Sequence, residues 1–417
     1  MTPFLKLVAD DLYHKLNGNF EHTTIIFPNK RASLFFNEYI WSNAQGKTMW
    51  TPEYTTISEL FTSLSDVVVG DSIYLTVKLW EVYQQIMQPT KTFDQLYPLM
   101  EMMLSDFQDV DNNMVEPEKL FMNIADWKKL TDFSFLEDEQ REAIEAFFGK
   151  ILDKADSDTP IRSHFNALWS QMANIYNTYR QSLLNEDDDM KMVYEGMLKR
   201  LIIEALRKED SEECKRITER LHAQTYVMVG FNVLNKTELE LFRYIKKHRD
   251  AKFYWDYDSS YTKKDNKSSI QTKYEAGQFI LENIRVLGNE FEGQDLFNNM
   301  RSSKQIAFVQ SPTENAQARY IHPWLKEHLK KDEPLRETAV ILCDEKLLQP
   351  VLHSIGDVPA MNVTMGYPLS ATPAYSLIQA LLDLPCLHES STIPFQGVRV
   401  RTSFRPLHLL YTILILP

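Results

Sequence analysis

The residues best suited to chemistry lie in one turn, Asn29, Lys30, Arg31 and Ser33. They follow the apolar run Thr23–Phe27, which predicts a buried strand, and they precede a helix that we expect to open at Ser33. Free backbone N–H groups and the helix dipole make such a helix start suited to phosphate. The turn has no glycine, although a nucleotide-binding loop needs glycines so that its backbone can wrap the phosphates. We therefore expect a phosphate contact here, but not a nucleotide loop.

Aromatic residues form a second candidate group. The segment Lys252–Tyr257 predicts a strand that carries Trp255 and Tyr257. Such rings can stack on nucleic-acid bases, at about 1–3 kcal/mol per base. They can also fill a core, with Phe253 and Trp255 on one strand face and Tyr254 on the other. We favour core packing for Phe253, and both interpretations stay open for Trp255.

Two short motifs resemble parts of an ATP site without its context. Gly46-Lys47-Thr48 resembles the end of a phosphate-binding loop, but the glycine required five positions earlier is replaced by Trp41. We expect a solvated loop there. Ser105–Asp111 resembles an acidic magnesium motif, but it follows a helical pattern instead of a buried strand. We expect an acidic turn between helices.

A better positioned strand for magnesium, Thr225–Phe231, ends in Gly230 and Phe231. Neither residue can hold a metal or act as a base. We expect Glu238 and Glu240, on the following helix, to lie on a solvated face. The sequence therefore predicts no catalytic residue, no cofactor and no metal ligand.

Composition limits the class of protein. A chain of 417 residues predicts two or three domains, and 44% hydrophobic with 25% charged residues predicts a soluble globular protein. The net charge of −13 argues against a generally basic nucleic-acid coat, but a local basic channel remains compatible with it. The three cysteines fit no metal spacing and favour a reducing, cytoplasmic setting. We expect no signal peptide and no membrane span.

Strands that alternate with helices predict an α/β fold with parallel sheets. Helices are expected at Phe4–Leu16 and Leu34–Trp41, and a short strand at Tyr54–Ile57 is followed by a helix capped by Ser58. Residues 72–184 are helical in pattern and rich in aromatic residues. Further strands are expected at 225–231, 252–257, 306–310 and 338–343, with helices at 237–245, 274–286, 314–329, 347–355 and 374–384.

These elements predict five segments. Residues 1–70 and 221–300 form a first α/β domain, into which a helical segment, 71–220, is inserted. Residues 301–384 form a partial second α/β domain, and 385–417 form an atypical tail.

The order of several segments resembles a known family. The segments are FPNKRAS, TTISEL, VMVGFNVLNKTELELF, FYWDYDSSY, IAFVQSPTENAQARYI, AVILCDEKLLQPVL and NVTMGYPLSATP. In this order the chain resembles, from residue 1 to about 384, the AddB-type subunit of bacterial helicase–nucleases that process DNA double-strand breaks, in its Bacteroidetes form. That resemblance implies a P-loop-NTPase, superfamily 1 helicase-like half, followed in longer relatives by a PD-(D/E)xK nuclease domain.

The resemblance assigns roles to three segments. FPNKRAS matches the helicase segment that touches single-stranded DNA, while the glycine loop is missing upstream. VMVGFNVLNKTELELF matches the magnesium strand with its acids replaced. AVILCDEKLL matches the segment where an active helicase places an arginine against the terminal phosphate, and Asp344 stands there.

The resemblance thus implies a non-catalytic, helicase-like scaffold subunit in DNA repair and recombination. It would hold single-stranded or end DNA through Asn29, Lys30, Arg31, Ser33, Trp255 and Tyr257. An AddA-type helicase–nuclease motor subunit would hydrolyse ATP, and this chain would hydrolyse neither ATP nor DNA. The acidic balance and the aromatic-rich helices leave an alternative, a helical protein–protein interaction scaffold without DNA contact.

The end of the chain departs from the resemblance. From Pro385 lysine disappears, and the run Leu409–Leu416 is almost entirely apolar. We expect a frameshifted or prematurely ended reading frame without the nuclease domain. The alternative is a genuine C-terminal strand that pairs in the sheet.

Overall fold

The computed structural model describes residues 2–121, 160–185, 191–262, 277–291, 296–328, 338–356 and 361–389. The chain divides into two compact units, Met1–Ser303 and Lys304–Pro417. The predicted tail lies outside the described residues from 390 onward, and residues 385–389 belong to helix α16 (Pro373–Glu389).

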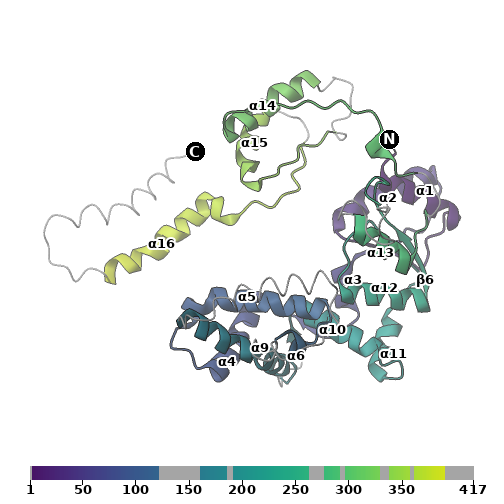
Figure 1. The fold of residues 1–417 in the computed structure, drawn as a ribbon. Helices are drawn as coiled ribbons and strands as arrows, with labels where there is room; N and C mark the ends of the chain where they lie inside the picture. Colours follow the sequence, from purple (N-terminus) through teal and green to yellow (C-terminus); the bar gives the residue numbers. More distant parts are fainter. Residues whose placement is uncertain are drawn as a thin grey trace, which may run out of the picture. The chain divides into compact units, whose positions relative to one another are not determined.

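The first unit is built on a four-stranded parallel sheet (Figure 1). Its strands are β1 (Thr23–Phe27), β2 (Glu53–Thr56), β5 (Thr225–Val229) and β6 (Asp250–Tyr254), in the order β2-β1-β5-β6. The pairing aligns Thr24 with Glu53 in β2 and with Tyr226 in β5. The α/β class and the parallel sheet are thus confirmed.

The two sheet faces bury different helices because side chains alternate along each strand. In β1, Ile25 and Phe27 join one cluster, whereas Ile26 joins the other. The first cluster includes buried residues of α1 (Phe4–Lys15) and α2 (Lys30–Ala44). The second includes residues of α12 (Lys236–His248) and α13 (Gln278–Leu287). Helices therefore cover both faces, as in doubly wound folds.

Helices occupy the described part of the chain between β2 and β5. They are α3 (Ile57–Ser63), α4 (Ser72–Met87), α5 (Phe93–Asn112), α6 (Pro117–Leu120), α9 (Pro160–Leu184), α10 (Glu195–Leu206) and α11 (Glu212–Arg220). Two short strands, β3 (Val68–Val69) and β4 (Met192–Val193), pair in parallel. The two segments that connect the sheet to the region around α4, α5 and α9 therefore lie side by side at β3 and β4.

A buried polar cluster lies in this helical region. Asp111 is fully buried, and its carboxylate accepts hydrogen bonds from the hydroxyl groups of Tyr176 and Tyr194. The Nη1 of Arg200 lies 3.2 Å from Oδ1 of Asp111. The predicted acidic turn at 105–111 is wrong, because these residues lie within α5 and Asp111 faces the core.

The close approach of α10 to α5 depends on Gly196. A methyl group at this position would lie 2.6 Å from the backbone oxygen of Gln108, closer than non-bonded atoms approach. Because backbone cannot move aside as a flexible side chain can, we expect Gly196→Ala to lower the free energy of unfolding by about 1–3 kcal/mol. Urea unfolding followed by circular dichroism measures this change. A matched control is alanine at Gly366, which has no positive φ and has open space around its Cβ position. An equal loss at both positions would show that the contact between α10 and α5 is not responsible.

Two expected helix starts are wrong, and side-chain caps explain both. Helix α2 begins at Lys30 instead of Ser33, because Oδ1 of Asn29 accepts a hydrogen bond from the N–H of Ala32, 3.2 Å away. Helix α3 is capped by Thr56 instead of Ser58, in a reciprocal arrangement with Glu59.

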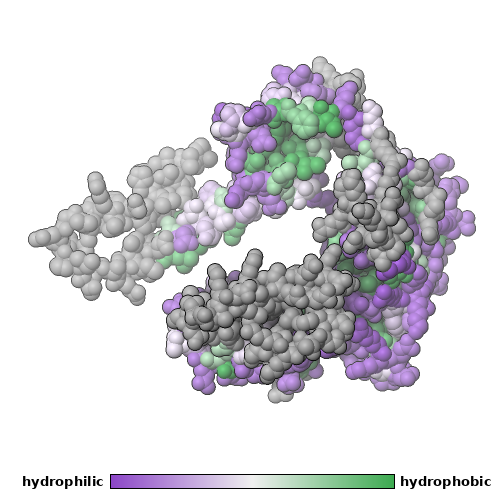
Figure 2. All heavy atoms as spheres, in the orientation of Figure 1, coloured by the Kyte–Doolittle hydropathy of each residue, from purple (hydrophilic) through white to green (hydrophobic). Residues whose placement is uncertain are grey.

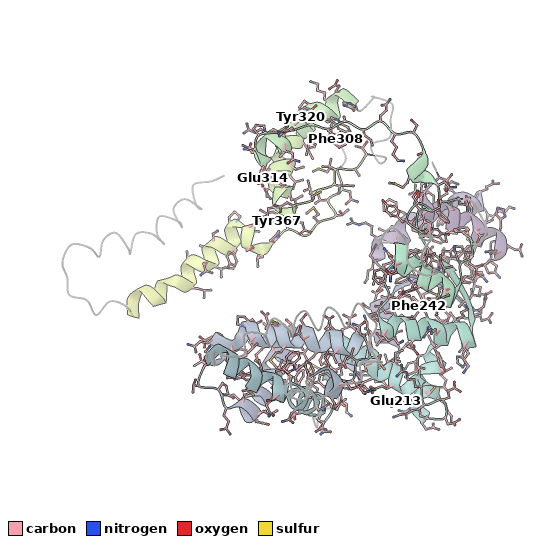
Figure 3. All side chains as sticks on the ribbon, viewed as in Figure 1. Glu213, Phe242, Phe308, Glu314, Tyr320 and Tyr367 are labelled. Carbon is pink, nitrogen blue, oxygen red and sulfur yellow. The ribbon has the colours of Figure 1, made fainter. Side chains whose placement is uncertain are left out.

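The second unit contains α14 (Glu314–His328), α15 (Leu348–Ile355) and α16, with short 3-10 helices at Asn299–Arg301 before it and at Glu345–Leu347 and Leu369–Ala371 within it. The strands expected at 306–310 and 338–343 are wrong, since neither segment is a strand in the described residues. Figure 2 shows apolar surface on this unit, where Phe308 (labelled in Figure 3) is 95% exposed. A strand needs a hydrogen-bonded neighbour and a covered face, and these segments have neither here.

Candidate nucleic-acid interface

The strand order singles out one position at the carboxyl edge of the sheet. From β1 the chain adds β2 on one side and then β5 on the other, so the winding direction reverses between β1 and β5. In open α/β sheets, ligands bind beyond the carboxyl ends of the strands at such a reversal. The turn with Asn29 and Lys30 follows β1 directly at this place.

Two of the expected site residues support the local backbone. The side chain of Asn29 caps α2, as described above. The hydroxyl of Ser33 donates a hydrogen bond to the carbonyl oxygen of Lys30 at 2.6 Å. Both side chains therefore hold the shape of the turn and leave the contact with any phosphate to their neighbours.

Lys30 and Arg31 are the exposed cations of this turn. The Lys30 side chain is 79% exposed, and its ammonium group forms an ion pair with Glu59 of α3. This pair and the hydrogen bond from the Thr56 N–H hold the pKa of Glu59 below its usual value. The first turn of α2 carries no acidic residue, although acids are the side chains that the helix dipole favours there. Positive charge therefore gathers at a helix start that attracts anions.

Acidic residues on the neighbouring helix starts are occupied by protein partners. Glu195 of α10 accepts a hydrogen bond from Ser58 at 2.8 Å and lies 3.0 Å from the ammonium group of Lys199. Lys199 also lies 3.3 Å from Glu238 of α12. The expected solvated face at Glu238 is wrong, because its side chain is 12% exposed and bonds both Lys199 and the N–H of its cap, Asn235. The two carboxylates thus share the ammonium group of Lys199.

The two aromatic residues expected at the interface after β6, Trp255 and Tyr257, differ in burial. Trp255 is 1% exposed, its ring stacks on Phe253, and its Nε1 donates to the carbonyl oxygen of Gly288 at 2.7 Å. A ring that is buried in this way offers no face to a base, so the stacking interpretation of Trp255 is wrong. Tyr257 is half-buried, with its ring 4.7 Å from that of Phe297. Both follow β6, two strand spacings (about 10 Å) from β1.

The end of β5 carries no side chain for metal chemistry. Gly230 follows the strand with a positive φ of 75°, and Phe231 packs against Phe242 of α12, which Figure 3 labels. Within the described ranges, no three His, Cys, Asp or Glu side chains gather as a metal ion would require. Asp344 is exposed, and its side chain accepts a hydrogen bond from the N–H of Lys346 at 3.0 Å.

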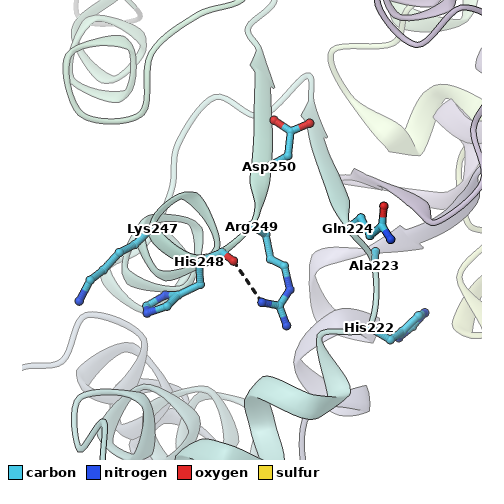
Figure 4. Close-up of a pocket in the computed structure, with 7 residues that line it drawn as sticks. All are labelled: His222, Ala223, Gln224, Lys247, His248, Arg249 and Asp250. Carbon is cyan, nitrogen blue, oxygen red and sulfur yellow. Dashed lines mark hydrogen bonds between the residues drawn. The ribbon is translucent and has the colours of Figure 1, made fainter.

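A polar pocket of about 640 Å³ opens at the opposite, amino edge of the sheet (Figure 4). Its lining residues are His222, Ala223, Gln224, Lys247, His248, Arg249 and Asp250. The Arg249 guanidinium donates to the carbonyl oxygens of Thr218 and Leu221 at the end of α11. Lys247 pairs with Glu209 at 2.7 Å. Arg249 and Lys247 of this pocket thus already bind carbonyl oxygens and a carboxylate of the protein itself. We therefore place the candidate site at the carboxyl edge instead.

The sequence analysis missed the exposed residues of α2. Leu34, Phe35 and Trp41 are 71%, 42% and 60% exposed, and Trp50, in the loop after α2, is 71% exposed. The buried residues Phe36, Ile40 and Ala44 recur every four positions and define the inner face. That spacing was readable in the sequence and assigns Leu34, Phe35 and Trp41 to the outer face.

Among the described residues, no helix combines the length and the apolar character needed to cross a bilayer. A scan against protein-family models finds no match, and a search of the curated proteins finds none.

Proposed function

We propose that this chain holds single-stranded DNA at the carboxyl edge of its sheet, as a non-catalytic scaffold subunit of a machine that repairs double-strand breaks. The observation that carries the proposal is the pair of exposed cations, Lys30 and Arg31, at the winding reversal between β1 and β5. The resemblance to AddB-type subunits supports the same role and the same turn. A separate AddA-type motor subunit supplies ATP hydrolysis in this proposal.

The geometry of the turn favours a phosphodiester over other ligands. The site is open, and its two cations stand at a helix start where backbone N–H groups add partial positive charge. Cations at this position repel the helix dipole, and a bound phosphate removes that repulsion. Since both cations are exposed, they can follow a flexible backbone without losing core contacts.

Replacing both cations tests the proposal. We expect Lys30→Ala combined with Arg31→Ala to weaken binding of an oligothymidine and to reduce the magnitude of the slope of log K against log salt by about 1.4, because two phosphate contacts are lost. Fluorescence anisotropy at several salt concentrations measures both quantities. Lys247→Ala is the matched control, since this exposed lysine lies at the amino edge. An unchanged slope in the double variant, or an equal loss in the control, would contradict the proposal.

Replacing Glu59 with glutamine should have the opposite effect and strengthen binding. Glutamine at this position keeps the cap of α3 but removes the carboxylate that competes for Lys30. We expect oligothymidine to bind up to about fivefold more tightly, as the loss of one exposed ion pair allows. Weaker binding would show that Glu59 helps to orient Lys30 for the ligand.

The alternative remains a protein–protein interaction scaffold. The exposed apolar residues of α2 and of the second unit favour it. Absence of salt-dependent binding to oligothymidine in the unmodified chain would select this alternative.

A further inference from the structure

We propose that the outer face of α2, defined by Arg31, Leu34, Phe35, Glu38 and Trp41, stacks the bases of single-stranded nucleic acid. The inference rests on the proposed function and adds the surface that receives the bases. It replaces Trp255, whose ring is buried, with rings that solvent can reach.

The spacing of these residues forms one continuous stripe. They recur at positions i, i+3, i+4, i+7 and i+10, which lie on one side of a helix. The opposite side is buried against α1 and the sheet through Phe36 and Ile40, and Ala44 on that side is also buried. A helix with one buried face normally carries polar residues on the other, so large apolar side chains here need a reason.

The aromatic rings have the chemistry for bases. Trp41 and Phe35 are 60% and 42% exposed, whereas tryptophan is highly buried in most proteins. An exposed ring offers a π-face on which any base can stack, which gives binding without sequence preference. The helix rise of about 1.5 Å per residue places Trp41 roughly 15 Å along α2 from Arg31. A short single strand can therefore reach phosphate and base contacts together.

Charge selects nucleic acid over an apolar protein surface as the occupant. Between Pro28 and Pro52 the chain has three cations, Lys30, Arg31 and Lys47, and one acid, Glu38. This stretch is positive in a chain whose net charge is −13. Cations interleaved with Phe35, Trp41 and Trp50 complement a ligand that carries both phosphates and rings.

Two substitutions test the stacking surface. We expect Trp41→Ala and Phe35→Ala each to weaken oligothymidine binding about fivefold or more, with the salt slope unchanged, because bases and not phosphates lose their contact. Trp41→Phe should restore most of the affinity. An oligonucleotide of the same length with abasic sites should bind the unmodified chain and the Trp41→Ala variant equally. Ile73→Ala, on α4, is the matched control, since it removes an exposed apolar side chain outside this face.

The outcomes separate this inference from the proposed function. If Lys30→Ala with Arg31→Ala lowers the slope while Trp41→Ala and Phe35→Ala bind as the unmodified chain does, the stacking surface is wrong and the proposed function stands. If Ile73→Ala weakens binding as much as Trp41→Ala, the loss is not specific to the rings and the inference is overturned. If the ring variants change the oligomeric state in light scattering, the face binds protein and the inference is also overturned. If the unmodified chain does not bind oligothymidine, both proposals fail.

Discussion

Replacing Asp111 with alanine is expected to lower the free energy of unfolding by about 3–5 kcal/mol, a large share of the stability of an ordinary domain. The carboxylate accepts hydrogen bonds from Tyr176 and Tyr194 and neutralises Arg200, all in the interior. Burial, and then the Asp111 carboxylate, raises the pKa of both tyrosines, so that both hydroxyls stay protonated and donate. Without Asp111, the Arg200 guanidinium loses one of its two carboxylate partners and keeps Glu204, 2.8 Å from its Nε. The two hydroxyls lose their acceptor.

Urea unfolding followed by circular dichroism measures the effect of Asp111→Ala. Asp109→Ala is the matched control, because Asp109 lies two residues away on the same helix but is exposed. We expect the control to change stability by less than about 1 kcal/mol. A similar midpoint for the Asp111→Ala variant and the unmodified chain would show that the cluster contributes no net stability.

Trp255→Ala is expected to cost about 3–5 kcal/mol of folding stability, through loss of buried area and the cavity that remains. The ring packs in the cluster that joins β6 to α12 and α13, and its N–H is bonded to Gly288. Trp255→Phe keeps most of the volume but loses the hydrogen bond, so we expect a smaller loss. Far-UV circular dichroism during urea unfolding measures both variants.

The Trp255 variants also separate core packing from base stacking. At low temperature and without urea, where the chain is folded, we expect the Trp255→Phe variant to bind oligothymidine as the unmodified chain does. Reduced binding by this variant, with unchanged stability, would return Trp255 to the interface. The contrast with Trp41, which is exposed, makes the two tryptophans opposite controls for each other.

Local sequence patterns predicted several strands and helices of the first unit correctly, where the apolar residues of the pattern are also the buried ones. Thr23–Phe27 forms β1, and the helix expected at Phe4–Leu16 ends one residue earlier, at Lys15. The run Thr225–Phe231 contains β5, which stops at Val229 because Gly230 turns the chain. Continuous apolar runs of this length are typical of strands that are covered on both faces.

The errors share a cause, which is that local patterns do not specify partners. The segments 306–310 and 338–343 have the composition of strands, but a strand forms only when a neighbour accepts its hydrogen bonds. Helix α2 begins three residues before the expected start, because the Asn29 side chain accepts a hydrogen bond from a backbone N–H of the first turn. Likewise, the acidic run Ser105–Asp111 predicted a turn between helices, yet it lies within α5 and Asp111 faces two tyrosines and an arginine in the core.

The sequence by itself determined the α/β class, the parallel strands of the first unit and the cationic turn at Lys30 and Arg31, because these depend on periodicity and residue type along a few residues. Only the tertiary structure decided which side chains solvent can reach. The order β2-β1-β5-β6 places the turn at the winding reversal. Packing in the cluster with α12 and α13 buries Trp255, and Glu59 of α3 pairs with Lys30. Strand order and burial arise from contacts between residues far apart in the chain, which no local pattern records.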